Sequence, residues 1–135
     1  MPIQLDHTIV PSRNPVASAR FLAELLDVPW EEQRGHFTPV YLNDGLTFDF
    51  DEREQFDGHH YCLRVSDEDF DKIFGRIQAG GIKYRSEPRG SDDSTINTRL
   101  GGRNIYWDDP DGHVWEMLTV SYARADSPLL SQVSS

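Results

Sequence analysis

The sequence predicts an α+β fold of two βαβββ modules, whose curved mixed sheets surround a metal-binding cavity. One observation is that the order strand, helix, then two or three strands occurs twice along the 135 residues. Another is that the last strand of each half carries one acid between large apolar residues, Phe48-Asp49-Phe50 and Trp115-Glu116-Met117. Two such sheets have apolar faces to bury, and pairing them edge to edge gives a curved sheet around a cavity. We expect a single domain over 1–135, with modules at about 3–51 and 59–120 and a C-terminal tail at 121–135.

The first half contains clear signals for a helix and for a hairpin. Asn14 can cap the free amides of a helix start and Pro15 is tolerated at the first helical position, so we expect a helix to begin there. Asn43-Asp44-Gly45 lies between two apolar runs, which predicts a hairpin turn. The expected elements are a strand at 3–10, a helix to about Leu26, and strands at 37–42 and 46–50.

The second half repeats this order. Ser66 and Asp67 are candidate caps for a helix with an apolar stripe at i, i+3, i+4 and i+7, and Gly80-Gly81 ends that helix. The other expected elements are strands at 60–65, 82–85, 103–108 and 113–120, a polar loop at 86–101 and a turn at 109–112. The tail from Ser121 is Ser-rich, and we expect it to be frayed or lightly docked.

The composition excludes several classes of protein. A net charge of -10 argues against a nucleic-acid partner, because phosphate binding requires a basic surface. No apolar run approaches the ~20 residues that a membrane span needs, and the N-terminus does not resemble a signal peptide, so we expect a cytoplasmic protein without a membrane segment. Cys62 is the only cysteine, so neither an intrachain disulfide nor a thiolate zinc cluster is expected.

Three residues on predicted strands form the candidate metal site: His7, His60 and Glu116. The two histidines lie on the first strand of each module, and Glu116 lies on the last strand of the second. Side chains alternate faces along a strand, so the apolar neighbours of Glu116 can pack under the helix while the acid points into the cavity. A carboxylate facing inward is costly unless it is paired or binds a cation, and a divalent metal therefore explains the set.

Three segments resemble the signature strands of the vicinal oxygen chelate superfamily, which includes glyoxalases, extradiol dioxygenases, fosfomycin-resistance transferases and bleomycin-type drug-binding proteins. These segments are Leu5–Val10, His60–Val65 and Asp109–Glu116, and the last is the most specific. The resemblance covers 3–120 and implies paired βαβββ modules with a divalent metal on His7, His60 and Glu116. In members of this length the modules usually meet in a homodimer, which implies that His60 and Glu116 come from one chain and His7 from the other.

Within that superfamily, the stretches 17–28, 59–77 and 101–119 look most similar to the ChaP-like oxidase group. This resemblance implies an extradiol-type dioxygenase or oxidase of antibiotic biosynthesis, with non-haem Fe(II), O2 and an aromatic polyketide substrate whose ring it cleaves or rearranges. Two histidines and one carboxylate leave several metal positions open, which is the arrangement that Fe(II) oxygenases use. The same ligands could hold Zn, Ni or Mn.

Two other functions stay open at this point. One is a glyoxalase-like isomerase or lyase that uses Zn or Ni. The other is a metal-free, drug-sequestering resistance protein, a class that usually lacks the metal ligands, so the intact set of His7, His60 and Glu116 counts against it.

Asp49, Arg64 and Tyr106 are the candidate catalytic residues. Asp49 fits equally well as a fourth metal ligand, which glyoxalases place on this strand, and as a general base or a group that hydrogen-bonds a ligand. Arg64 shares the strand parity of His60 and could pair with Asp49 or a substrate anion, or could be a solvent-exposed strand end. Tyr106 and Asn104 lie on a strand that we expect to line the pocket, and we expect His113, in the turn, to be structural.

Overall fold

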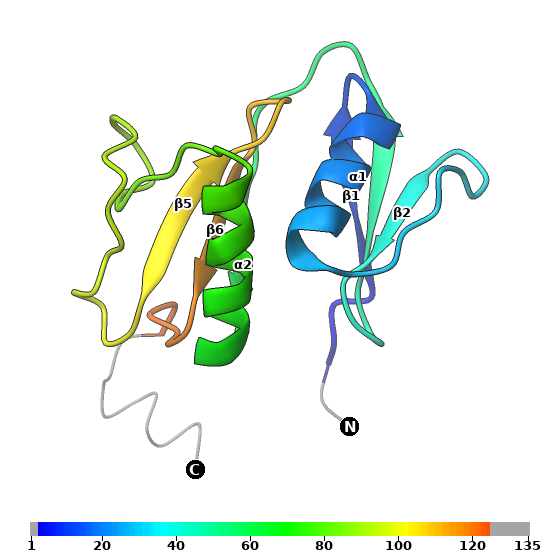
Figure 1. The fold of residues 1–135 in the computed structure, drawn as a ribbon. Helices are drawn as coiled ribbons and strands as arrows, with labels where there is room; N and C mark the ends of the chain where they lie inside the picture. Colours follow the sequence, from blue (N-terminus) through cyan, green and yellow to red (C-terminus); the bar gives the residue numbers. More distant parts are fainter. Residues whose placement is uncertain (1–2, 125–135) are drawn as a thin grey trace. The chain divides into compact units, whose positions relative to one another are not determined.

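The structure, a computed structural model, describes residues 3–124 in two compact units (Figure 1). The first unit comprises 3–59 together with 109–113, and the second comprises 60–108 together with 114–124. Each unit contains one helix and one mixed three-stranded sheet. The predicted α+β class with two similar modules is therefore confirmed. Neither helix in the described residues is long and apolar enough to cross a membrane.

The first unit contains β1 (His7–Ser12), α1 (Pro15–Leu26), β2 (Thr38–Tyr41) and β3 (Thr47–Glu52). The strand order is β1-β3-β2, with β1 parallel and β2 antiparallel to the central β3. The helix starts where the sequence predicts, because the side chain of Asn14 accepts a hydrogen bond from the backbone N–H of Ala17 at 3.2 Å. Residues 3–6, predicted as part of a strand, lie outside β1, because the parallel ladder begins only where β3 begins, at Thr47.

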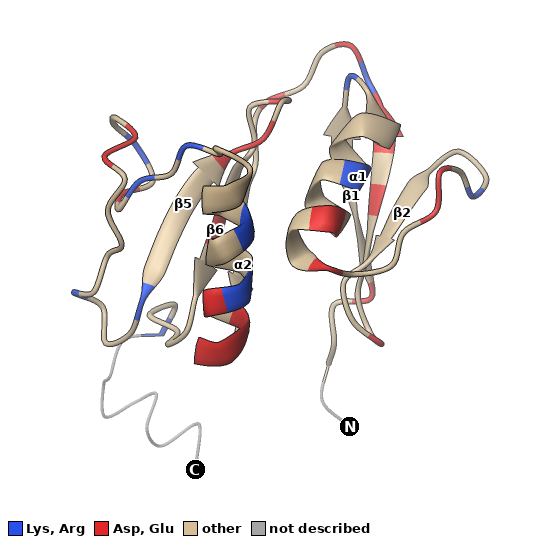
Figure 2. Cartoon of the chain, in the orientation of Figure 1, with Lys and Arg blue, Asp and Glu red and all other residues tan. Residues whose placement is uncertain are grey.

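The second unit contains β4 (His60–Arg64), α2 (Asp67–Ala79), β5 (Asn104–Asp108) and β6 (Val114–Leu118), in the order β4-β6-β5. Ser66 caps α2 by accepting from the N–H of Asp69 at 3.1 Å, and Gly80 ends the helix as predicted. The first turn of α2 carries three acids, visible in red in Figure 2, which suit the positive end of the helix dipole.

The strand predicted at 82–85 is reduced to one isolated bridge, between Arg85 and Tyr106 of β5. Asn97, farther along the loop, forms a second bridge to β5 at Asn104. The loop between them folds back on itself, since the carboxylate of Asp93 accepts from the backbone N–H of Ser86 at 3.0 Å and from its hydroxyl at 2.6 Å. These bonds tie the loop to the residue that directly follows the bridge at Arg85.

The turn at 109–113 belongs to the first unit and is anchored there by polar contacts. Asp111 accepts from the backbone N–H of Arg13 at 2.9 Å and from the Ser18 hydroxyl at 2.7 Å. His113 is fully buried, with Nε2 2.7 Å from the carbonyl oxygen of Pro11 and Nδ1 accepting from the N–H of His59 at 2.9 Å. The expectation that His113 is structural is thus confirmed.

The two sheets have equivalent strand registers. His7 is the first residue of β1 and His60 is the first residue of β4. Asp49 pairs with Ile9 and Pro39. In the same way, Glu116 pairs with Cys62 and Tyr106. Asp49 and Glu116 therefore occupy equivalent positions of the two modules.

Candidate metal centre

The polar face of the second sheet is set by strand alternation. Trp115 and Met117 on β6, and Ile105 and Trp107 on β5, point to the apolar side and are almost fully buried. The residues between them, Glu116 on β6 and Tyr106 on β5, point to the opposite face, together with His60 and Cys62 of β4. Alternate residues of the same strands therefore form the core on one side of the sheet and the polar face on the other.

His60 and Glu116 form the centre of that face. Glu116 is 0% exposed, and its Oε1 lies 3.0 Å from Nε2 of His60, whose side chain is 45% exposed. Two ligand atoms that each lie about 2.1 Å from a metal, at roughly a right angle, are about 3 Å apart. In the structure this distance is that of a hydrogen bond, and the donor types and their spacing also fit a divalent metal between an imidazole nitrogen and a carboxylate oxygen.

The other oxygen of Glu116 is held by neutral donors. Oε2 accepts from the Tyr122 hydroxyl at 2.6 Å and from Nδ2 of Asn104 at 3.1 Å. Tyr106 joins this network, with its hydroxyl 3.2 Å from Nδ2 of Asn104 and 3.1 Å from the hydroxyl of Tyr122. The carboxylate can only accept, which sets the amide orientation of Asn104, and the buried Oδ1 of that amide has no partner among the described residues.

The hydroxyl and thiol groups around Glu116 keep their protons. Burial raises the pKa of Tyr122, and its hydrogen bond to Glu116 raises it further. Burial also raises the pKa of Tyr106. The hydrogen bond with Tyr122 lowers this pKa, and the negative charge of Glu116 raises it. Burial and the nearby carboxylate raise the pKa of the Cys62 thiol to about 12. At neutral pH these groups are therefore donors to the carboxylate rather than anions beside it.

His7 and Asp49 lie together on the polar face of the first sheet. They line a depression of about 530 Å³ with six other residues, Asp6, Arg34, Phe37, Pro39, Tyr41 and Thr47. The His7 side chain is 60% exposed, and its Nδ1 lies 2.7 Å from a carboxylate oxygen of Asp6. That hydrogen bond raises the pKa of His7 and orients the ring so that Nε2 faces away from Asp6 and is available as a ligand. Burial raises the pKa of Asp49, while the charge of nearby His7 opposes this change.

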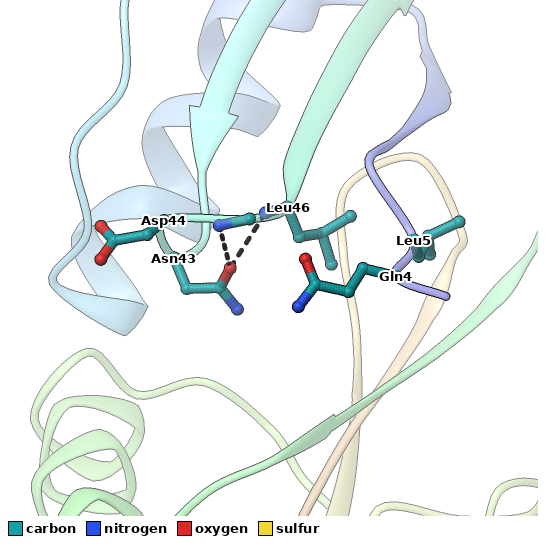
Figure 3. A pocket seen from close by; sticks show the side chains of 6 residues that line it. Gln4, Leu5, Asn43, Asp44 and Leu46 are labelled. Carbon is teal, nitrogen blue, oxygen red and sulfur yellow. Dashed lines mark hydrogen bonds between the residues drawn. The ribbon is translucent and has the colours of Figure 1, made fainter. Parts of the chain in front are cut away.

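A larger depression, of about 630 Å³, lies at the tip of the β2–β3 hairpin (Figure 3). It is lined by Gln4, Leu5 and the turn 43–46. The side-chain oxygen of Asn43 accepts from the N–H groups of Gly45 at 2.8 Å and Leu46 at 2.9 Å, so it holds the turn. These residues stabilise the hairpin and offer no metal-ligand set.

The predicted site residues therefore fall into two groups. His60, Glu116 and Tyr106 meet in the second unit, and His7 and Asp49 meet in the first. Arg64 ends β4 on the same face as His60 and is exposed. Within residues 3–124, no group of three or more His, Cys, Asp or Glu side chains is close enough to hold a metal.

Tyr122 is the site residue that the sequence did not reveal. It follows the last strand, in a segment predicted to be frayed or lightly docked, yet its hydroxyl reaches Glu116. The one available signal was its type, since a tyrosine is unusual in a Ser-rich tail.

Comparisons with known proteins point to one group of enzymes. No protein-family model and no curated protein matches the chain. Among solved structures, the oxidase ChaP-H2 is 42% identical, with 91% of this chain and 98% of that chain covered and a TM-score of 0.84. The oxidase ChaP-H1 is 39% identical, with 91% and 100% covered and a TM-score of 0.84. A glyoxylase/bleomycin resistance protein/dioxygenase domain from Frankia sp. EAN1pec shares the fold, at 18% identity, 92% and 96% coverage and a TM-score of 0.67.

Proposed function

Because the chain belongs to the vicinal oxygen chelate superfamily, in the group of ChaP-type oxidases, we propose that it is an Fe(II)-dependent oxygenase of aromatic polyketide substrates. Enzymes of this superfamily bind divalent metals and act on small molecules, and its members often form dimers. The observation that carries the proposal is the pairing of His60 with a fully buried Glu116 in a chain 42% identical to an oxidase.

In this proposal the metal is held by Nε2 of His60, Oε1 of Glu116 and the His7 side chain of a second copy. Two donors on β4 and β6 are too few for a stable site, and the described residues of one copy form no metal-binding group of three His, Cys, Asp or Glu side chains. A homodimer supplies the missing imidazole, as the family resemblance implies. When bound, Fe(II) supplies the electron-transfer and Lewis-acid chemistry that lets an aromatic substrate react with O2.

The chain's own residues have defined tasks in this proposal. The depression beside His7 offers Phe37, Pro39 and Tyr41 as apolar walls for a flat aromatic ring. Asp49 lies in the same depression, and burial raises its pKa against the opposing charge of His7, which makes it a better acceptor for a phenol proton. The exposed guanidinium of Arg64 is available to bind an anionic group of the substrate.

The Tyr106 hydroxyl belongs to the network around Glu116 and faces the side of the sheet that carries His60. Its ring meets the His60 ring edge-on, with centroids 5.9 Å apart, and so limits the rotation of that imidazole.

We place the reaction in the cytoplasm, as a step in the biosynthesis of an antibiotic.

The test is metal analysis of full-length protein purified without oxygen, beside His60→Ala and Glu116→Gln. Glu68→Gln is the matched control, because Glu68 is exposed on α2 and pairs with Lys72 across one helical turn. We expect near-stoichiometric iron in the wild type and the control, its loss in both site variants, and O2 uptake with polycyclic phenols only where iron is bound.

Other outcomes would point to the competing functions. Zinc or nickel on the same residues, without O2 uptake, would favour a glyoxalase-like isomerase or lyase. A protein that binds none of Fe(II), Zn(II) or Ni(II) would contradict both enzyme functions and favour a drug-binding protein.

A further inference from the structure

We propose that Tyr122 is a positioning residue that makes Glu116 a ligand through Oε1 alone. This inference rests on the proposed metal site at His60 and Glu116. It assigns a task to residues 119–124, the described part of the chain after β6, which contain no strand.

The two oxygens of Glu116 have different partners. Oε1 lies 3.0 Å from Nε2 of His60, the atom proposed to share the metal with it. Oε2 accepts two hydrogen bonds from neutral groups, one from Tyr122 and one from Asn104. A carboxylate can bind a metal through one oxygen or both, and occupying Oε2 leaves Oε1 as the oxygen that is free to bind.

The bond from Tyr122 is the stronger of the two. At 2.6 Å its O–H···O⁻ distance lies in the range of charge-assisted hydrogen bonds, whereas the amide of Asn104 donates at 3.1 Å. The hydroxyl of Tyr122 also lies 3.1 Å from that of Tyr106, which limits its rotation. The raised pKa of Tyr122 is consistent with a hydroxyl that stays protonated beside the carboxylate.

Tyr122 is also the partner that can be removed with least damage to the fold. Tyr122 is 40% exposed, whereas Asn104 and Tyr106 on β5 are buried. Replacing Tyr122 with Phe removes one hydroxyl and keeps the ring. Oε2 then loses its shorter hydrogen bond and keeps the longer one from Asn104, so the carboxylate can rotate or bind through both oxygens.

The experiment is a Co(II) titration of the metal-free full-length protein, followed by calorimetry and by visible absorption of the bound Co(II). The variants are Tyr122→Phe and, as the matched control, Tyr84→Phe, which removes a hydroxyl from a tyrosine that packs edge-on against Phe74. We expect Tyr122→Phe to raise the Kd for Co(II) by about 10- to 100-fold, the usual loss when a hydrogen-bonding partner of a ligand is removed. We also expect a changed Co(II) spectrum with an unchanged Tm.

The outcomes separate this inference from the proposed function. If the wild type binds Co(II) and Tyr122→Phe binds it with the same Kd and spectrum as Tyr84→Phe, the positioning role is wrong and the metal site stands. If the wild type and both variants fail to bind Co(II), the metal site itself is wrong, and the inference falls with it. A weakened Kd with an unchanged spectrum would also overturn the inference, because a purely structural role predicts that result.

Discussion

Glu116 in the second unit and Asp49 in the first occupy the same position in equivalent sheets, yet their neighbours differ. Across the antiparallel ladder, Glu116 faces Tyr106, whereas Asp49 faces Pro39, which has no side-chain donor and no N–H. Across the parallel ladder, Glu116 faces Cys62 and Asp49 faces Ile9. Tyr122 and Asn104 complete the donor set of Glu116.

This difference shows how one backbone register can produce two kinds of carboxylate. Donors around Glu116 fix the orientation of its carboxylate, as a metal ligand requires. Asp49 has an apolar ladder neighbour on each side, and burial raises its pKa. It therefore suits proton transfer better than permanent charge. Whether Asp49 is a metal ligand or a base can therefore be measured.

The largest difference between the modules that we expect to measure concerns their cores. Trp107 and Val40 occupy equivalent register positions and are both 0% exposed. Replacing Trp107 with Ala should lower the free energy of unfolding by about 3–5 kcal/mol, because it leaves a large cavity. Val40→Ala removes only two methyl groups and should cost about 2 kcal/mol. Urea denaturation measures both, and equal losses would show that the two cores are not packed as described.

The second prediction separates the two carboxylates. Glu116→Gln should raise the Kd for Fe(II) or Co(II) by more than about 100-fold, beyond the loss seen when only a ligand's hydrogen-bonding partner is removed. Asp49→Asn should leave metal affinity nearly unchanged and lower kcat. Calorimetry and O2 uptake test this pair, and a comparable loss of affinity in Asp49→Asn would identify Asp49 as a fourth ligand.

The third and smallest effect concerns the two turns, in which Asp111 and Asp44 occupy equivalent places. Burial alone would raise the pKa of Asp111, but hydrogen bonds from Ser12, Ser18 and the backbone of Arg13 outweigh burial and lower it. A lowered folded-state pKa contributes stability above the unfolded pKa of about 3.9, and this contribution is lost as pH falls through the folded value.

Asp111→Asn should therefore lower the free energy of unfolding by about 1–2 kcal/mol at neutral pH. Hydrogen bonds to a charged group contribute in this range, and the Asn side chain replaces only part of that contribution. The difference from the wild type should shrink as pH falls below about 4. Asp44 is exposed, so Asp44→Asn is the matched control and should not change this pH dependence. Urea denaturation at several pH values measures the effect, and a difference that grows at low pH would have the wrong sign for this account.

Much of the fold could be predicted from local sequence signals. Asn14 and Ser66 mark helix starts through their side chains, and Gly81, at φ 64°, takes the left-handed conformation just after α2 ends. Strand ends were less accurate, because a ladder ends where its partner ends. Residues 3–6 extend past the start of β3, and the predicted strand at 82–85 is reduced to a bridge at Arg85.

The candidate site could be predicted where it follows strand parity and not where it depends on the tertiary fold. Alternation predicted that Glu116 points away from its apolar neighbours on β6, and the register places Glu116 between Cys62 and Tyr106. The network on Oε2 of Glu116 depends on Tyr122, which reaches the carboxylate from outside the sheet. No periodic pattern marks such a residue, because its position is set by where the chain runs after β6.

The central claim is that His7 of one copy and His60 and Glu116 of another hold one metal. The most direct test co-expresses His7→Ala and His60→Ala chains with different tags, isolates the mixed population without oxygen and measures bound iron. If the ligands are shared between two copies, each variant alone binds no iron, and random pairing in a two-fold dimer restores about one quarter of the sites. If the mixed population stays without iron while the wild type binds it, the site is not shared between copies and the account is wrong.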